Sequence, residues 1–255
     1  MALQAEVTHL LDAVVGAVST VLCEELLGVY VRGSLATDDF VPETSDVDTL
    51  MVTERPVTEA EFALLAAMHA DLARLPSAYA NRLEAAYIGR EALRRFQPGL
   101  SHPTLGQGET LLMTEHREHW VLERWVVREH GITLVGPQPR TLIDPVSRDQ
   151  IRAAVRSRLQ QWAGWVTEQD APGWVAHPGL QAYIVETMCR ALHALSCGEP
   201  TSKAAAVGWA LESLPAEWRP LVAQAQRWKR EGGPPAAVNP EVKGFVWWAA
   251  AGAGE

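Results

Sequence analysis

The residues best suited to chemistry lie close together near the start of the chain, in the stretch VYVRGSLATDDFVPETSDVD. Gly33 and Ser34 follow one apolar run, and Asp46 and Asp48 stand where the next apolar run begins. Alternate residues of a β-strand project from the same face, so we expect the two carboxylates side by side, with Val47 pointing the opposite way into a core. Two carboxylates held so close repel each other unless a cation lies between them.

The ion that suits this arrangement is Mg²⁺, which proteins often hold through one or two carboxylates together with substrate phosphates. Gly33 allows the backbone to approach a phosphate closely, and Ser34 can offer its hydroxyl and amide groups to phosphate oxygens. The pattern therefore predicts metal-assisted phosphoryl or nucleotidyl transfer, with Asp46 and Asp48 as metal ligands. The alternative is that Asp46 caps a turn and Asp48 is merely exposed.

The elements that must position these residues alternate in type along the first part of the chain. Apolar spacing and turn residues predict helices over 5–27, 58–75 and 117–131, and strands over 29–31, 47–53, 82–88 and 132–136. Thr58 and Glu61 have the spacing of a capping box at the start of the second helix. The segment 89–114 is interrupted by Gly and Pro and is left unassigned. The alternation predicts an α/β domain that ends near residue 145.

The pattern changes after residue 145 to long helical segments separated by Pro and Gly. We expect helices over about 148–168, 180–196, 202–214 and 216–231, the first of them with a capping box formed by Ser147 and Gln150. Seven of the ten tryptophans lie from Trp165 onward. The pattern therefore predicts a helical bundle with large core residues over 146–255.

At its Gly-Ser and Asp-x-Asp motifs the chain resembles the DNA-polymerase-β-like nucleotidyltransferase superfamily. Most of the chain is similar to the bacterial aminoglycoside adenylyltransferases that act on streptomycin and spectinomycin, as the stretches REHGITLVGPQPRTLIDPV, CRALHALSCGEPTSK and AAAVGWALESLPAEWRPL indicate. The resemblance implies an α/β (α+β) nucleotidyltransferase domain with a mixed sheet over 1–145, followed by an all-α domain over 146–255. It also implies Mg²⁺-dependent transfer of AMP from ATP to a hydroxyl of such a cationic antibiotic, with release of pyrophosphate.

The resemblance further implies the roles of single residues. Asp46 and Asp48 would bind catalytic Mg²⁺, and Glu84, in LEAAYI, would be the general base for the attacking hydroxyl. A carboxylate near the metal can accept that proton if it lies within hydrogen-bond reach. The alternative for Glu84 is a solvated edge residue on a half-polar strand.

The helical half would supply the remaining contacts to the nucleotide. Arg190 and Lys203 match family positions that contact nucleotide phosphates, and both would then approach the triphosphate from the second domain. The alternatives are an i,i+4 pair of Arg190 with Glu186, and simple solvation of Lys203 near a helix start.

The acceptor pocket is where the resemblance is thinnest. Trp162 and Asp170 are the candidates for substrate contacts, because a cationic amine needs a carboxylate partner when it is buried. The family's aromatic wall has no clear counterpart in 97–120, where Trp120 is either that wall or a core residue. Thr49 stands where the superfamily usually has a hydrophobic residue. His116 and His119 lie on neighbouring helical turns, but no further set of metal ligands accompanies them.

Composition bounds the remaining possibilities. The formal charge of −9, from 22 basic and 31 acidic residues, disfavours nucleic acid as a partner and modestly favours a cationic small molecule. Three irregularly spaced cysteines indicate neither a disulfide framework nor a zinc site. We expect no leader and no membrane span, and hence a cytoplasmic protein. The alternatives to antibiotic transfer are another small metabolite or a protein side chain as acceptor, or a catalytically silent nucleotide-binding homologue.

Overall fold

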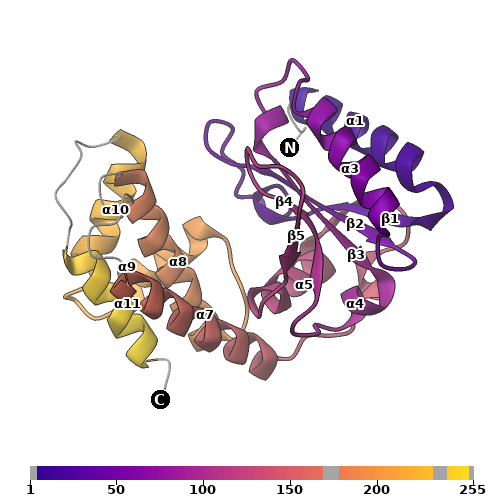
Figure 1. Cartoon of the computed structure of the whole chain (residues 1–255). Helices are drawn as coiled ribbons and strands as arrows, with labels where there is room; N and C mark the ends of the chain where they lie inside the picture. The colour runs from indigo at the N-terminus through magenta and orange to yellow at the C-terminus, as the bar shows by residue number, and fades with distance from the viewer. Residues whose placement is uncertain (1–4, 169–177, 232–239, 253–255) are drawn as a thin grey trace. The chain divides into compact units, whose positions relative to one another are not determined.

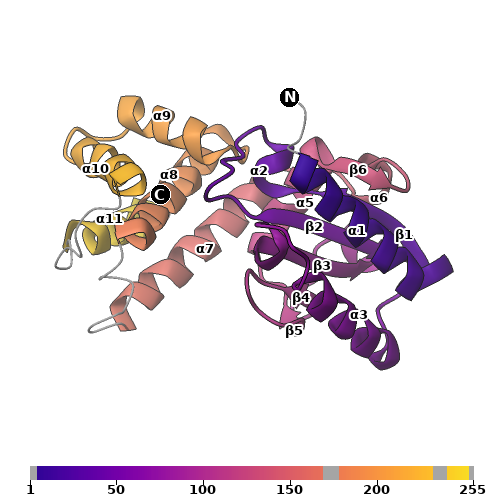
Figure 2. The ribbon, with the colours of Figure 1, turned by 90° about the horizontal axis from the view of Figure 1, so that it is seen from above.

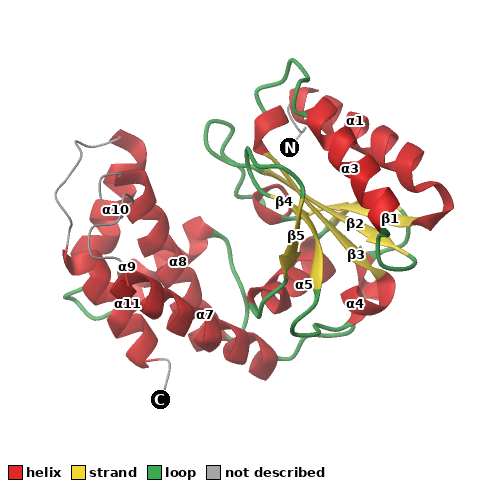
Figure 3. Ribbon diagram, in the orientation of Figure 1, coloured by secondary structure: helices red, strands yellow, loops and turns green. Residues whose placement is uncertain are grey.

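The computed structural model describes residues 5–168, 178–231 and 240–252, and Figure 1 traces the chain. Its backbone contacts divide the chain into two compact units, Met1–Val146 and Ser147–Glu255. The first unit contains a β-sheet with helices, whereas every regular element described in the second unit is a helix (Figure 3). An α/β unit followed by an all-helical unit is the fold class that the sequence predicts.

The first unit is built on a six-stranded mixed sheet in the order β5-β4-β3-β2-β1-β6. Only β2 and β3 run parallel among the paired strands, and each of the other pairs is antiparallel. The strands are β1 (Leu26–Val31), β2 (Val47–Thr53), β3 (Leu83–Gly89), β4 (Ser101–Leu105), β5 (Leu112–Glu115) and β6 (Ile132–Val135). The helices are α1 (Ala5–Leu22), α2 (Gly33–Ala36), α3 (Glu59–Leu72), α4 (Arg90–Arg94), α5 (His119–His130) and α6 (Pro139–Leu142), with short 3₁₀ turns at Cys23–Glu25 and Ala80–Arg82.

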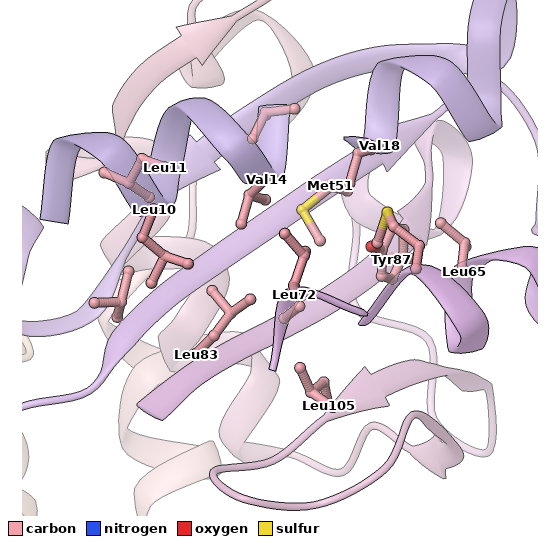
Figure 4. Close-up of a cluster of buried hydrophobic side chains, with 14 of the residues drawn as sticks. Leu10, Leu11, Val14, Val18, Met51, Leu65, Leu72, Leu83, Tyr87 and Leu105 are labelled. Carbon is pink, nitrogen blue, oxygen red and sulfur yellow. The ribbon is translucent and has the colours of Figure 1, made fainter. Parts of the chain in front are cut away.

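Helices cover both faces of this sheet, and the arrangement can be followed in Figure 2. One core joins the buried faces of α1 and α3 to the side chains of Met51 and Leu83 (Figure 4), and Val47 belongs to the same core. A second core joins Leu50 and Ala86 on the opposite face to residues of α4, α5 and α6. Because strand side chains alternate, odd-numbered residues of β2 and β3 face α1 and α3, and even-numbered ones face α5.

The first helix is shorter than its apolar spacing predicts. It ends at Leu22 rather than at residue 27, because Cys23 adopts a left-handed backbone conformation (φ 47°) that opens a 3₁₀ turn. The strand β1 then begins at Leu26. The segment Ala5–Glu25 is long and apolar enough by composition to cross a membrane, contrary to the expectation that no such segment is present. Six of the apolar residues of α1 are instead buried in the core of the first unit: Val7, Leu10, Leu11, Val14, Val18 and Leu22.

The segment left unassigned by the sequence contains regular structure. It forms α4 and the antiparallel strands β4 and β5 at one edge of the sheet. Pro103 lies inside β4, paired with Met113 of the edge strand. A proline removes one backbone donor from the ladder, which is why the sequence pattern gave no clear sign of a strand.

The second unit consists of five described helices, and α8 packs against the other four. They are α7 (Arg148–Glu168), α8 (Pro178–Cys197), α9 (Lys203–Ser213), α10 (Arg219–Glu231) and α11 (Pro240–Gly252). The predicted capping box is formed: the Ser147 amide donates to Gln150 Oε1, and the Gln150 amide donates to Ser147 Oγ. The sequence pattern did not predict α11, whose Phe245 and Trp248 pack with Trp218.

Candidate active site

The pairing of β2 with β3 brings two of the predicted site residues together. The strands run parallel with Val47 opposite Leu83 and Asp48 opposite Glu84. Val47 and Leu83 are buried in the core beneath α1, as the alternation predicts for Val47. Asp48 and Glu84 therefore project from the other face, on the side of α5. Glu84 lies on an inner strand of the sheet, so the alternative of a solvated edge residue does not describe its position.

The Gly-Ser pair approaches the same carboxylates from the end of β1. The Arg32 amide donates to the Asp48 carbonyl oxygen at 2.9 Å, which holds the start of α2 beside β2. Gly33 has φ +62°, a left-handed conformation that glycine adopts without strain. A Cβ atom at this position would lie 2.0 Å from Asp48 Oδ2. The residue is thus glycine for two reasons, its backbone conformation and the closeness of the Asp48 carboxylate.

Replacing Gly33 with alanine should consequently disturb Asp48 directly. The methyl group would push the carboxylate aside and would strain the backbone, so we expect activity to fall by about 10²-fold, the scale of a misplaced reacting group. Steady-state turnover checks this, with Gly99→Ala as the matched control. Gly99 also has positive φ (+79°), but an added Cβ there meets nothing within 4 Å. Equal losses of activity in the two variants would contradict the assignment.

Asp46 lies immediately before β2, at the end of the loop that follows α2. Arg82 fixes this loop, because its guanidinium donates to the Pro42 carbonyl at 2.9 Å and also to the carbonyl of Ser45. Burial is the main cause that raises the pKa of Glu84, and the charge of Asp46 is near enough to add a small contribution in the same direction. Asp46 therefore belongs electrostatically to the group formed by Asp48 and Glu84.

The environment of Glu84 favours a proton on its carboxylate. Burial and the charge of Asp48 raise the pKa of Glu84 to about 7, even though Arg32 acts in the opposite direction. The Thr49 hydroxyl donates to the Glu84 carbonyl oxygen at 2.8 Å and so ties β2 to β3 at this point. A threonine after Asp48, where the superfamily usually has an apolar residue, is fully buried here and contributes a hydrogen bond.

Two charged residues of this group were not singled out from the sequence. Arg32 forms ion pairs with Asp48 at 3.3 Å, with Glu84 at 3.5 Å and with Glu123 of α5 at 2.9 Å. Arg32 directly precedes the Gly-Ser motif, which could have drawn attention to it. Glu123 is one of two acids on α5, and only the packing of this helix reveals which of them faces the sheet.

Trp120 occupies a core position beside this group. It is 5% exposed, stacks on the His116 ring with centroids 3.7 Å apart, and lies under the Arg32 guanidinium. His116 is also buried, and its Nε2 shares a hydrogen bond with Thr104 Oγ1 at 2.9 Å. Burial lowers the pKa of His116 to about 2. The geometry thus supports the core interpretation of Trp120 rather than an aromatic wall for a substrate.

The oxygen donors at this site fit Mg²⁺ held jointly by protein and substrate. Within the described parts of the chain, no three His, Cys, Asp or Glu side chains converge as a complete metal site. Mg²⁺ does not require one, since it is commonly bound through one or two carboxylates and by substrate phosphates. Asp48 is the carboxylate that lies against Gly33, and Asp46 lies two residues earlier, immediately before β2.

The predicted phosphate contacts of the helical half lie within the second unit. Arg190 is on α8, and its Nε donates to the Thr201 carbonyl oxygen at 3.1 Å. Lys203 begins α9 two residues later, and its Nζ lies 5.5 Å from the centre of the Tyr183 ring. The structure therefore brings Arg190 to the segment that leads into Lys203. The alternative was a pair of Arg190 with Glu186. The Glu186 carboxylate instead binds Lys229 and Gln226.

Of the two candidate acceptor residues, only Trp162 lies in the described part of the chain. Trp162 lies on α7, packs edge-on against Trp165 with centroids 5.3 Å apart, and has the Arg158 guanidinium over its ring. Its indole Nε1 is buried and has no hydrogen-bond partner in the described part of the chain. Asp170 lies outside the described residues.

Known proteins resemble this chain across both units. A family model described as a nucleotidyltransferase domain matches residues 17–96, and one described as the C-terminal domain of aminoglycoside adenylyltransferase matches residues 141–247. The aminoglycoside (3'') (9) adenylyltransferase of Escherichia coli is 26% identical over 247 residues, covering 88% of this chain and 85% of that protein. The spectinomycin 9-adenylyltransferase of Campylobacter jejuni is 24% identical over 226 residues, covering 84% and 82%.

A solved structure shares the fold over nearly the whole length. It is the crystal structure of a spectinomycin adenyltransferase from Enterococcus faecialis with ATP and spectinomycin, which matches with a TM-score of 0.75 and 16% identity. The match covers 97% of this chain and 99% of that one. Together, the sheet with its paired acidic residues, the helical second unit and the two family models show that the chain belongs to the aminoglycoside adenylyltransferase family and is an adenylyltransferase.

Proposed function

We propose that this enzyme transfers AMP from Mg·ATP to a hydroxyl group of an antibiotic of the streptomycin or spectinomycin type and releases pyrophosphate. The observation that carries the proposal is the register of the central strands, which sets Asp48 directly opposite Glu84 and beside Gly33. Nucleotidyl transfer requires three parts: a carboxylate that binds a metal ion, a carboxylate that accepts a proton, and a glycine turn that receives phosphate.

Glu84 is the proposed general base. Its carboxylate accepts the proton of the acceptor hydroxyl as that oxygen attacks the α-phosphorus of ATP. The new oxygen–phosphorus bond forms while the bond from the α-phosphorus to the bridging oxygen breaks, and that oxygen leaves with pyrophosphate. The raised pKa of Glu84, about 7 in the metal-free protein, suits a group that exchanges a proton near neutral pH.

The other residues bind and orient. Asp46 and Asp48 would hold Mg²⁺, which when bound supplies the charge that neutralises the triphosphate. Gly33 and Ser34 would receive phosphate oxygens at the start of α2, and the fixed loop around Arg82 keeps Asp46 at the start of β2. Arg190 and Lys203 are proposed to contact the nucleotide phosphates from the second unit.

The acceptor is proposed from the names of the relatives and from charge. The relatives are named for aminoglycosides and for spectinomycin, and the formal charge of −9 favours a cationic acceptor over nucleic acid. We propose Trp162 and Asp170 as acceptor contacts in the second unit. A small antibiotic modified with intracellular ATP also accords with a cytoplasmic enzyme.

The experiment that tests the proposal is pyrophosphate release from Mg·ATP with streptomycin, spectinomycin and a panel of other aminoglycosides. We expect release that depends on one or both of the first two compounds, and a product heavier than the antibiotic by one AMP group in mass spectrometry. The same assay without Mg²⁺ should show no release, because the triphosphate charge is then not neutralised.

Other outcomes would redirect the proposal. Release with ATP alone, accompanied by AMP attached to the protein, would indicate a protein side chain as acceptor. Binding of ATP without release under the whole panel would leave the family assignment intact and contradict the proposed antibiotic acceptor.

A further inference from the structure

The guanidinium of Arg32 contacts three carboxylates that come from three different elements. Its Nη1 lies 3.3 Å from Asp48 Oδ1 and 2.9 Å from Glu123 Oε2, and its Nη2 lies 3.5 Å from Glu84 Oε2. The Arg32 side chain is only 10% exposed. A fixed positive charge thus lies against the same two carboxylates to which the proposed function gives the metal and the proton.

The three contacts differ in kind. The contact with Glu123 is a hydrogen bond, whereas those with Asp48 and Glu84 are longer ion pairs. The guanidinium also lies 5.5 Å from the centre of the Trp120 ring, at cation–π distance. Glu123 and Trp120 are both residues of α5, so this helix sets the position of the Arg32 guanidinium. The positive charge of Arg32 then acts on the carboxylates of Asp48 and Glu84.

The arrangement does not optimise the hydrogen bonds of the arginine itself. Its Nε is buried and has no hydrogen-bond partner in the described residues. A buried guanidinium normally uses its five donors, and an unused buried donor is costly. The placement is better explained by charge, since Asp48 and Glu84 stand directly opposite each other and would otherwise repel.

We propose that Arg32 is a built-in counter-cation of the metal site, held by Glu123 so that Asp48 and Glu84 stay together when no metal is bound. The proposal rests on the proposed function, because it takes Asp48 as a metal ligand. It makes Arg32 a positioning residue that also opposes the entry of a divalent cation, since both positive charges act on the same carboxylates. Glu123 lessens this opposition because it draws part of the arginine charge towards α5.

The proposal predicts effects of opposite sign on metal binding and on stability. Arg32→Gln should bind a divalent cation about tenfold more tightly, because one opposing positive charge is removed from a partly buried site. The same variant should have a lower melting temperature without metal, because the strand carboxylates lose their counter-cation. A residue with a merely structural function would behave differently, since its loss would loosen the site and weaken metal binding.

The test uses the full chain and Mn²⁺ alone as the probe, with free Mn²⁺ measured by electron paramagnetic resonance. Melting temperatures are recorded with and without Mn²⁺ for the wild type, Arg32→Gln and Arg32→Lys. Arg32→Lys should stay close to wild type because it keeps the charge. Arg74→Gln is the matched control: it removes the same charge from an arginine that is 76% exposed and pairs only on the surface with Asp71. Its Mn²⁺ affinity should not change.

Tighter Mn²⁺ binding by Arg32→Gln, together with its lower metal-free melting temperature, is the expected result. Equal or weaker binding by a folded Arg32→Gln overturns the proposal, and so does tightening of the same size in Arg32→Lys. If Arg32→Gln does not fold, Glu123→Gln decides, since it should weaken Mn²⁺ binding several-fold and unchanged binding would overturn the proposal. Absence of Mn²⁺ binding in every variant would overturn it too, whereas the proposed function has its own test in pyrophosphate release.

Discussion

Glu84→Gln should lower turnover by about 10³-fold, because it removes the proposed general base and leaves the shape of the side chain nearly unchanged. The fold should remain intact, since the hydrogen bond that ties β2 to β3 here, from the Thr49 hydroxyl, is accepted by the Glu84 main-chain carbonyl and is kept in the variant. Pyrophosphate release with the active antibiotic measures the loss. The Michaelis constant for ATP should change little, because the base acts on the acceptor hydroxyl.

The same substitution should stabilise the metal-free protein at alkaline pH. Burial and Asp48 raise the pKa of Glu84 from 4.5 to about 7, so the folded state binds this proton more tightly than the unfolded state. The stability contributed by the protonated group is fully present below pH 4.5 and is lost as the pH rises through about 7. The melting temperature of Glu84→Gln should therefore exceed that of wild type at pH 8 and approach it near pH 4.5.

A surface substitution separates this effect from a general change of charge. Glu91 lies exposed on α4, and Glu91→Gln removes the same charge without touching the strand carboxylates. Its melting temperature should follow wild type at both pH values. A Glu84→Gln protein that is both fully active and no more stable at pH 8 would contradict the general-base assignment and the electrostatic account together.

The sequence could predict the parts of this site that depend on local geometry. Alternation along a strand is enough to put Asp46 and Asp48 on one face and Val47 in the core, and the structure confirms the burial of Val47. Glu84 was assigned through family resemblance, and the parallel register that sets it opposite Asp48 is a tertiary feature that no local pattern contains. Its catalytic function stays a prediction.

What the sequence missed depends on how distant segments meet. Arg32 and Glu123 are 91 positions apart, and neither has a spacing that marks it as a partner of the other. The end of α1 was misplaced because Leu26 and Leu27 continue the helical apolar spacing although the backbone turns at Cys23. Apolar periodicity reports burial, and burial alone does not distinguish the last turn of a helix from the first residues of a strand.

Asp48→Asn should abolish antibiotic-dependent pyrophosphate release, with a loss of more than about 10³-fold, because the proposed metal ligand loses its charge while keeping its size. The carboxylate of Asp48 has close neighbours on several sides. The residue pairs with Arg32, stands opposite Glu84 and has its carboxylate where a Cβ on Gly33 would lie. Each of these neighbours borders the carboxylate on a different side, so a loss of turnover would not be explained by a change in the position of this side chain.

Metal binding separates the chemical explanation from a structural one. Mn²⁺ affinity should fall with turnover in Asp48→Asn, while the metal-free melting temperature should hold or rise, because one of the clustered carboxylates is neutralised. Asp46→Asn should show the same pairing of lost turnover with weaker Mn²⁺ binding. Asp71→Asn, a change on the exposed face of α3, serves as the control and should leave both unchanged. Retained transfer in Asp48→Asn would remove the acidic pair from the mechanism, whereas lost transfer with unchanged Mn²⁺ affinity would move the metal to other ligands and leave Asp48 to orient Arg32 and Glu84.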